Sequence, residues 1–208
     1  AAGSIGSEIV RQLLKFKPHK LILLDQAETP LFDLKNELFK TNHATQFEFL
    51  LRSVCNYASV EQCFIAHTID VVFHAAAYKH VYMTETIPTS AVLNNILGTK
   101  NVVDVAIKNK VAHFVMVSTD KAVNPSNVMG ASKRIAEMYV ANQAESSNTQ
   151  LITTRFGNVL GSNGSVVPIF KEQIAKGGPV TVTHPEITRF FMTITEACQL
   201  VLEAGATG

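Results

Sequence analysis

The residues best suited to chemistry follow one another in the middle of the chain. Thr119, Asp120 and Lys121 form a triplet, and Met129 and Lys133 come about ten residues later. Asp120 and Lys121 carry adjacent opposite charges and could exchange protons with a substrate. A solvated loop pair is the plain alternative for these two charges alone. Met129 and Lys133 are four positions apart, so on a helix they would share one face.

A glycine-containing loop opens the chain and precedes a helical pattern. Gly3, Ser4, Ile5 and Gly6 have the spacing of the last part of a G-x-x-G-x-x-G loop, which lets backbone N–H groups and a helix N-terminus approach a pyrophosphate. An ordinary glycine turn is the alternative. Asp25 lies 19 residues after Gly6, where an acidic residue can accept hydrogen bonds from an adenosine ribose. This spacing favours an NAD site over an NADP site.

Small residues follow another apolar run. Ala75 and Ala76 come after the run at 71–73, where small side chains would let a flat cofactor lie close to the backbone. Lys79 and His80 follow within reach of a substrate, although an ordinary surface role is equally compatible with Lys79. No cysteine, histidine or carboxylate spacing indicates a metal site.

These residues need a scaffold, and the hydrophobic pattern predicts one. Nearly continuous apolar strands that alternate with amphipathic helices indicate a parallel sheet covered on both faces, which is the doubly wound α/β (Rossmann) architecture. The strand before the glycine loop would lie upstream of residue 1. We expect strands at 21–24, 46–51, 71–73, 114–117 and 151–156, and helices at 7–16, 31–40, 60–66, 91–108 and 131–143.

The pattern changes after residue 157. Several glycines mark a loop-rich region with helices expected near 167–175 and 195–204. We therefore predict a dinucleotide-binding domain over 1–157, truncated at its start, and part of a smaller substrate-binding region over 158–208.

Composition excludes several classes of protein. The 208 residues are 47% hydrophobic and 17% charged, which is compatible with a large buried core. A net charge of +1 without a basic block predicts no nucleic-acid partner, and no apolar run is long enough to predict membrane contact from this segment. Three cysteines without a pairing pattern fit a reducing compartment, so we expect the cytoplasm. The parent chain could carry an upstream membrane anchor.

The chain resembles the UDP-N-acetylglucosamine 4,6-dehydratases of bacterial polysaccharide and protein-glycan synthesis, which are extended short-chain dehydrogenases/reductases. That superfamily normally has Tyr-x-x-x-Lys where this chain has Met129 and Lys133. The larger members of the group also carry methionine there and are active. The strings that carry the resemblance are Gly3-Ser-Ile-Gly-Ser-Glu8, His74-Ala-Ala-Ala-Tyr-Lys-His80, Asn94-Asn95 with Gly98-Thr99, Ser118 through Arg134, Arg155 through Pro168, and Ile187-Thr-Arg-Phe190.

The resemblance implies a reaction and a set of roles. Hydride leaves C4 of the sugar for NAD, water is eliminated across C5 and C6, and hydride returns to C6. Thr119 would hydrogen-bond the C4 hydroxyl, Asp120 would be the acid at C6 and Lys121 the base at C5. Lys133 would hold the nicotinamide ribose, and Asn158 would meet the nucleotide diphosphate. Because Met129 cannot transfer a proton, we expect Asp120 to accept the proton of the C4 hydroxyl, directly or through water.

Two positions and two alternative functions stay open. Arg189 is a candidate phosphate or substrate contact, since guanidinium groups suit phosphate oxygens, with an internal salt bridge as the alternative. Relatives have an aspartate that contacts adenine where this chain has Ser53, which puts that contact in doubt.

The alternatives to a dehydratase are a nucleotide-sugar epimerase or reductase and a non-catalytic NAD-binding module. We expect a UDP-sugar as substrate and a homo-oligomer, as in many relatives.

Overall fold

The computed structural model describes residues 1–162, 164–182 and 184–208, and all of its paired strands run parallel. β1 (Lys20–Asp25) pairs with β2 (Gln46–Leu51). β4 (His113–Thr119) lies between β3 (Val71–His74) and β5 (Gln150–Phe156). The two-residue strands β6 (Asn158–Val159) and β7 (Phe191–Met192) form a third pair. All five strands expected from the sequence are therefore confirmed.

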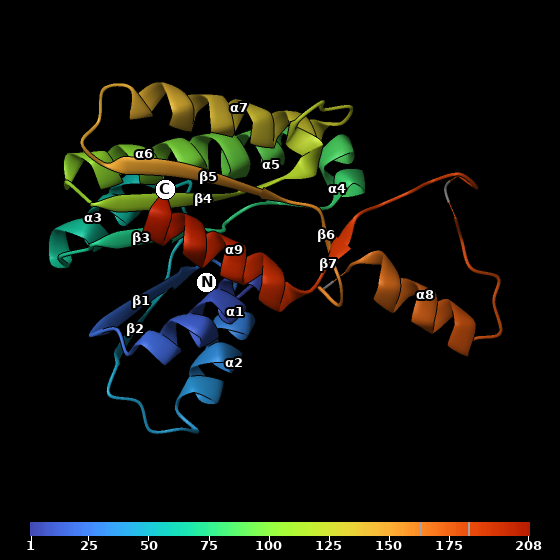
Figure 1. Cartoon of the computed structure of the whole chain (residues 1–208), viewed down its shortest axis with the longest axis horizontal. Helices are drawn as coiled ribbons and strands as arrows, with labels where there is room; N and C mark the ends of the chain where they lie inside the picture. Colours follow the sequence, from blue (N-terminus) through green and yellow to red (C-terminus); the bar gives the residue numbers. More distant parts are fainter. Residues whose placement is uncertain (163, 183) are drawn as a thin grey trace.

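Helices cover both faces of the strands, as Figure 1 shows. On one face lie α3 (Tyr57–Ala66), α6 (Gly98–Lys108) and α7 (Val128–Ala144), and on the other lie α1 (Ser4–Leu13) and α9 (Ile194–Thr207). This is the doubly wound α/β arrangement that the sequence predicts. The remaining helical segments are η1 (Leu14–Phe16), α2 (Glu28–Leu38), α4 (Val81–Thr86), α5 (Pro88–Ala91), η2 (Val92–Leu97), η3 (Asp120–Ala122) and α8 (Val166–Ala175).

The alternation of side chains along β4 explains why this strand is apolar throughout. Phe114 and Met116 point into a core formed with α3, α6 and α7. Val115 points the other way, into a core that includes Val201 of α9. Successive side chains of a strand face opposite sides of the sheet. A strand that is buried on both faces therefore does not alternate between polar and apolar residues.

The helix predicted over 91–108 is wrong as a single regular helix. The structure has α5, then a π-helical turn, η2, and then α6. The wide turn contains Asn95, which is fully buried and bonds with its amide to the backbone of Tyr78. These bonds join the wide turn to the loop after β3, and π-turns are frequent at functional sites. The short helix α4 was not predicted.

The last helix returns from the second predicted region to the first. α9 packs on α1, β4 and β5, whereas α8 has no buried residue and projects away from the sheets in Figure 1. The division at residue 157 stays a prediction, and the structure shows that the chain crosses it twice.

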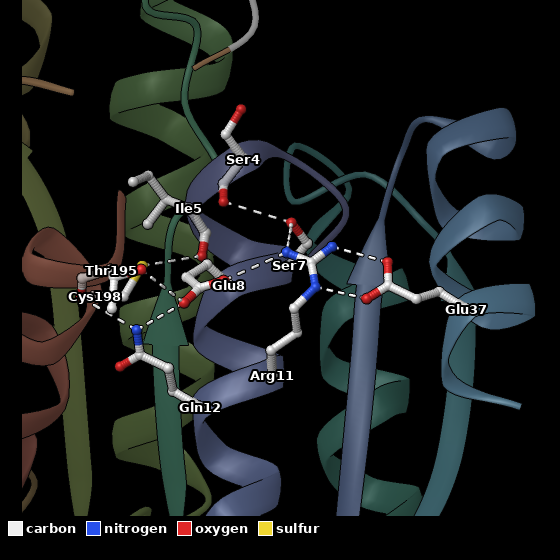
Figure 2. A network of polar contacts seen from close by, with 9 residues as sticks. All are labelled: Ser4, Ile5, Ser7, Glu8, Arg11, Gln12, Glu37, Thr195 and Cys198. Atoms are coloured by element: carbon white, nitrogen blue, oxygen red, sulfur yellow. Dashed lines mark hydrogen bonds and ion pairs between the residues drawn. The ribbon is translucent and has the colours of Figure 1, made fainter. Parts of the chain in front are cut away.

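Polar contacts hold α1 between two other helices (Figure 2). Gln12 donates from Nε2 to the Thr195 carbonyl at 3.1 Å and to Glu8 at 2.9 Å. On the other side, Arg11 makes two hydrogen bonds to Glu37 of α2, at 2.6 and 2.8 Å. The helix that follows the glycine loop is thus fixed relative to both α2 and α9.

Within the described residues, no helix is long and apolar enough to cross a membrane. The same residues contain no group of three or more histidine, cysteine, aspartate or glutamate side chains placed to hold a metal ion. All three cysteines are free thiols.

Candidate active site

The candidate residues converge where several parallel strands end. Asp25 ends β1, Thr119 ends β4, and Ala75 and Ala76 follow β3 directly. Both alanines are half-buried. In open α/β sheets, ligands bind outside the carboxyl ends of the strands. The fold therefore brings the predicted cofactor and substrate residues to one edge.

Thr119, Asp120 and Lys121 form a hydrogen-bonded unit. Asp120 Oδ1 accepts from Thr119 Oγ1 at 2.9 Å and from Lys121 Nζ at 3.0 Å. Lys121 Nζ also donates to Asn158 Oδ1 at 2.9 Å. Burial alone would raise the pKa of Asp120, but the hydrogen bonds from Lys121 and Thr119 lower it below its ordinary value. Asp120 is therefore ionised at neutral pH.

Helix α7 lies directly against this triplet. A Cβ added to Gly130 would lie 2.5 Å from the backbone oxygen of Lys121, so only glycine permits the approach. Asn127 caps the helix by accepting from the Gly130 N–H at 2.8 Å. A second cap comes from Glu85 of α4, which accepts from the Val128 N–H at 2.7 Å. These contacts fix the helix that carries Met129 and Lys133, both of which are buried.

Lys133 is a buried cation without a hydrogen-bonding partner among the described residues. Its side chain is only 4% exposed. Burial lowers its pKa to about 8, and the nearby charge of Glu137 opposes that shift. His74 is equally buried, and its Nε2 lies 2.9 Å from Thr99 Oγ1. Burial first, and then the charge of Lys133, lower the pKa of His74 to about 3, so this histidine is neutral and structural.

A buried carboxylate, which the sequence analysis missed, joins three elements behind the triplet. Glu137 of α7 accepts from Ser118 Oγ at 2.5 Å and from Arg155 of β5 at 2.9 and 2.6 Å. Burial would raise the pKa of Glu137, but the bonds from Arg155 and Ser118 keep it low. The sequence offers one signal, because Glu137 is one helical turn after Lys133 and shares its face.

Asn95 is a second buried polar residue whose role the sequence motif does not predict. Its Oδ1 accepts from the Tyr78 N–H at 2.8 Å, and its Nδ2 donates to the Tyr78 carbonyl at 3.0 Å and to Ser132 Oγ at 3.0 Å. Ser132 lies on α7 beside Lys133. Asn95 therefore holds the loop after β3 against the helix that carries the buried lysine.

The glycine loop packs closely against the chain at Gly6 and is open at Gly3. A Cβ on Gly6 would lie 2.4 Å from the backbone oxygen of Ala1, so Gly6 permits close packing of the helix on the loop. A Cβ on Gly3 would meet nothing within 4 Å, so this part of the backbone faces open space. Ser4 and Ile5 begin α1, and the N-terminus of a helix can bind an anion.

The Asp25 carboxylate already accepts hydrogen bonds from the glycine loop. Its Oδ2 accepts from the Ala2 N–H at 2.7 Å and the Ala1 nitrogen at 2.8 Å, and its Oδ1 accepts from the Ala27 N–H at 2.9 Å. The backbone hydrogen bonds from Ala2 and Ala27 stabilise the ionised form of this carboxylate. A carboxylate has about four acceptor positions, so capacity remains for a ribose hydroxyl.

The predicted substrate residues divide between two places. Lys79 donates to Ser162 Oγ at 3.4 Å, and burial lowers its pKa. A Cβ on Gly164 would lie 2.6 Å from the His80 ring, so both side chains face the loop that follows β6. Arg189 is exposed and donates to the Thr188 carbonyl at 2.7 Å, without an ion pair to any described residue. Among the described residues, no hydrogen bond or ion pair joins Arg189 to the triplet, although its neighbour Phe190 lines the cavity beside Asp120.

A cavity of about 330 Å³ opens beside Asp120. Its lining is mainly apolar and comes from β5, β7 and α9, with Asp120 and Arg155 as its charged members. The lining residues are Asp120, Val123, Arg155, Phe156, Gly157, Phe190, Met192 and Leu200.

Comparison with known proteins gives consistent results along the whole chain. The chain is 54% identical over 209 residues to the capsular polysaccharide biosynthesis protein CapD of Staphylococcus aureus, an alignment that covers 99% of this chain and 35% of CapD. It is 39% identical to a UDP-glucose 4-epimerase of Rickettsia rickettsii, over 97% of this chain and 60% of that protein. This chain thus spans about a third of CapD and three fifths of the epimerase.

Solved structures agree on the fold. The X-ray structure of Pen from Bacillus thuringiensis superposes with a TM-score of 0.92 at 37% identity, covering 100% of this chain and 64% of Pen. The UDP-glucose 4-epimerase of Thermus thermophilus, solved in complex with NAD, superposes with a TM-score of 0.85 at 23% identity, covering 100% of this chain and 73% of the epimerase, which supports the fold alone. Residues 1–208 match the family described as polysaccharide biosynthesis protein, and the chain belongs to that family.

Proposed function

We propose that the protein is an NAD-dependent dehydratase that converts a UDP-N-acetylhexosamine, UDP-N-acetylglucosamine above all, into a UDP-4-keto-6-deoxy sugar. The observation that carries this proposal is the hydrogen-bonded triplet of Thr119, Asp120 and Lys121 at the sheet edge, next to buried Lys133. The 54% identity to CapD supports a role in polysaccharide biosynthesis. The N-acetyl group rests on the family resemblance.

The residues present fit a nicotinamide dinucleotide. The open space above Gly3 could receive the pyrophosphate, and Asp25 could receive the adenosine ribose. Lys133 has no acceptor among the described residues, and the hydroxyl oxygens of a nicotinamide ribose would supply one. The carboxylate at Asp25 favours NAD over NADP because it would repel a 2′-phosphate. When bound, the nicotinamide supplies hydride acceptance at C4 and hydride return at C6.

Protons can be balanced with the triplet alone. Thr119 donates to Asp120, so its oxygen can in turn accept from the C4 hydroxyl and pass that proton to the ionised carboxylate. Asp120 then holds the proton that the C6 hydroxyl needs when it leaves as water. Lys121, in its neutral form, takes the C5 proton, which exchanges with solvent on the amine, and the amine delivers a solvent-derived proton to C5 at the end. Met129 takes no part in these transfers.

This proton route is tested with Asp120→Asn under single-turnover conditions. Reduced nicotinamide should accumulate much more slowly than in the unmodified protein, because the C4 hydroxyl loses its proton acceptor. Accumulation at the unmodified rate would exclude Asp120 as that acceptor.

An epimerase is the second candidate, since the Rickettsia relative bears that name. The triplet favours the dehydratase, because simple C4 epimerisation needs neither a base at C5 nor an acid at C6. Incubation of the full-length protein with UDP-N-acetylglucosamine and mass spectrometry of the product separate the candidates. Loss of one water supports the dehydratase and an unchanged mass with inverted C4 supports the epimerase. An unchanged substrate would contradict both candidates and would support a non-catalytic NAD-binding module.

Compartment and assembly belong to the same proposal. We place the reaction in the cytoplasm and the protein in a homo-oligomer. Exposed Ile135 and Met138, on the outer side of α7, support a helical contact between copies. Lys79, His80, Asn158 and Arg189 stay proposed substrate contacts, in a substrate-binding region proposed to begin at residue 158.

A further inference from the structure

Asn158 holds the amine of Lys121 from a different element. The Asn158 side-chain oxygen accepts from Lys121 Nζ at 2.9 Å, and the side chain of Lys121 is only 29% exposed. The other acceptor is the neighbouring Asp120, at 3.0 Å. No third described residue accepts from this amine.

The two acceptors differ in what they can fix. Asp120 is adjacent to Lys121 in sequence, so it moves with the lysine and cannot by itself aim a flexible four-carbon side chain. Asn158 lies on β6, 37 residues away along the chain. A contact from a separate strand sets the direction in which the amine points.

Asn158 is itself well anchored. Its N–H donates to the Phe190 carbonyl at 3.1 Å, and β6 pairs with β7. β7 leads into α9, which begins with a capping box between Thr193 and Glu196 and packs on the sheet. The position of Asn158 therefore depends on the sheet and α9 and not on the projecting helix α8.

We infer that Asn158 is a positioning residue for Lys121, which aims the amine at the C5 proton of the sugar. This inference rests on the proposed dehydration and differs from a role in diphosphate binding alone. In this contact the Lys121 amine is the donor, so the asparagine oxygen faces it and the amide Nδ2 faces away. No described residue accepts from that Nδ2, so it stays available to a substrate oxygen.

The test compares Asn158→Ala with the unmodified full-length protein in D₂O. Two quantities are measured: the rate of deuterium incorporation at C5 of the product, and the affinity for UDP by calorimetry without turnover. A misaimed base should slow C5 exchange by about 10- to 100-fold at saturating substrate, which is more than any fall in UDP affinity accounts for. Asn158→Asp retains an acceptor for Lys121 and should recover part of the exchange rate.

Asn42→Ala, an exposed loop substitution remote from the site, is the matched control and should change neither quantity. Exchange at the unmodified rate in Asn158→Ala would overturn the inference. So would a loss that the fall in UDP affinity accounts for entirely, because Asn158 would then be only a diphosphate contact. No C5 exchange in the unmodified protein would overturn the proposed function, and this inference with it.

Discussion

At the scale of single residues, two buried charges shape the site in opposite ways. Lys133 has no hydrogen-bonding partner among the residues that the structure describes, whereas Glu137 accepts from Arg155, Ser118 and, more weakly, Arg134. A buried charge costs free energy unless it is paired. Unpaired Lys133 therefore destabilises the fold, which a functional role would explain. Paired Glu137 stabilises the fold.

Replacement of Lys133 by methionine should therefore stabilise the fold. The folded pKa is about 8 against an ordinary 10.5, so between these values the unfolded chain binds more protons and stability rises with pH. At pH 7 the free energy of unfolding should rise by up to about 3 kcal/mol in Lys133→Met, and the gain should shrink toward pH 10. Urea unfolding at both pH values measures it. Lys15→Met, at an exposed position, should show no such gain.

Replacement of Glu137 by glutamine should have the opposite effect. It leaves Arg155 without its partner and should lower the free energy of unfolding at pH 7 by about 2–4 kcal/mol. The pKa of Glu137 is lowered in the fold, so its contribution is present above the ordinary glutamate pKa and is lost as the pH falls below it. The difference from the unmodified protein should hence shrink in acid. Glu172→Gln, in an exposed pair on α8, should behave like the unmodified protein throughout.

At the scale of elements, the glycine loop offers a matched pair of substitutions. Gly6→Ala places a methyl group 2.4 Å from backbone and should destabilise the fold, whereas Gly3→Ala meets nothing within 4 Å and should fold normally. Because the space above Gly3 is proposed to hold the pyrophosphate, Gly3→Ala should still weaken NAD binding. Thermal melts with and without NAD measure both effects. Normal NAD binding by folded Gly3→Ala would contradict the placement of the pyrophosphate.

The elements differ in how far the sequence predicts them. Buried parallel strands such as β4 are continuous apolar runs, which local pattern detects directly. The π-turn at Asn95 was missed because its bonds go to Tyr78, 17 residues earlier. The Glu137–Arg155 pair and the contact of Asn158 with Lys121 were not predicted either, because their partners are far apart in the sequence. Motif resemblance located the triplet and Lys133, but partners that depend on tertiary packing came only from the structure.

At the scale of the whole molecule, α9 belongs to the core and α8 does not. Val201 of α9 is fully buried with Ile9, Val115 and Cys198, whereas Ile174 of α8 is 64% exposed. Val201→Ala should lower the free energy of unfolding by about 2 kcal/mol, because it leaves a cavity between α9 and the sheet. Ile174→Ala is the control and should leave it nearly unchanged. Equal losses in chemical denaturation would contradict this division.

The central claim is that the triplet performs a dehydration in which Lys121 removes the C5 proton and later delivers a solvent-derived proton to C5. The most direct measurement is the mass and NMR spectrum of the product formed from UDP-N-acetylglucosamine by the full-length protein in D₂O. The account predicts a product that has lost one water and carries one solvent deuterium at C5. A product of unchanged mass, or one dehydrated without deuterium at C5, would contradict it.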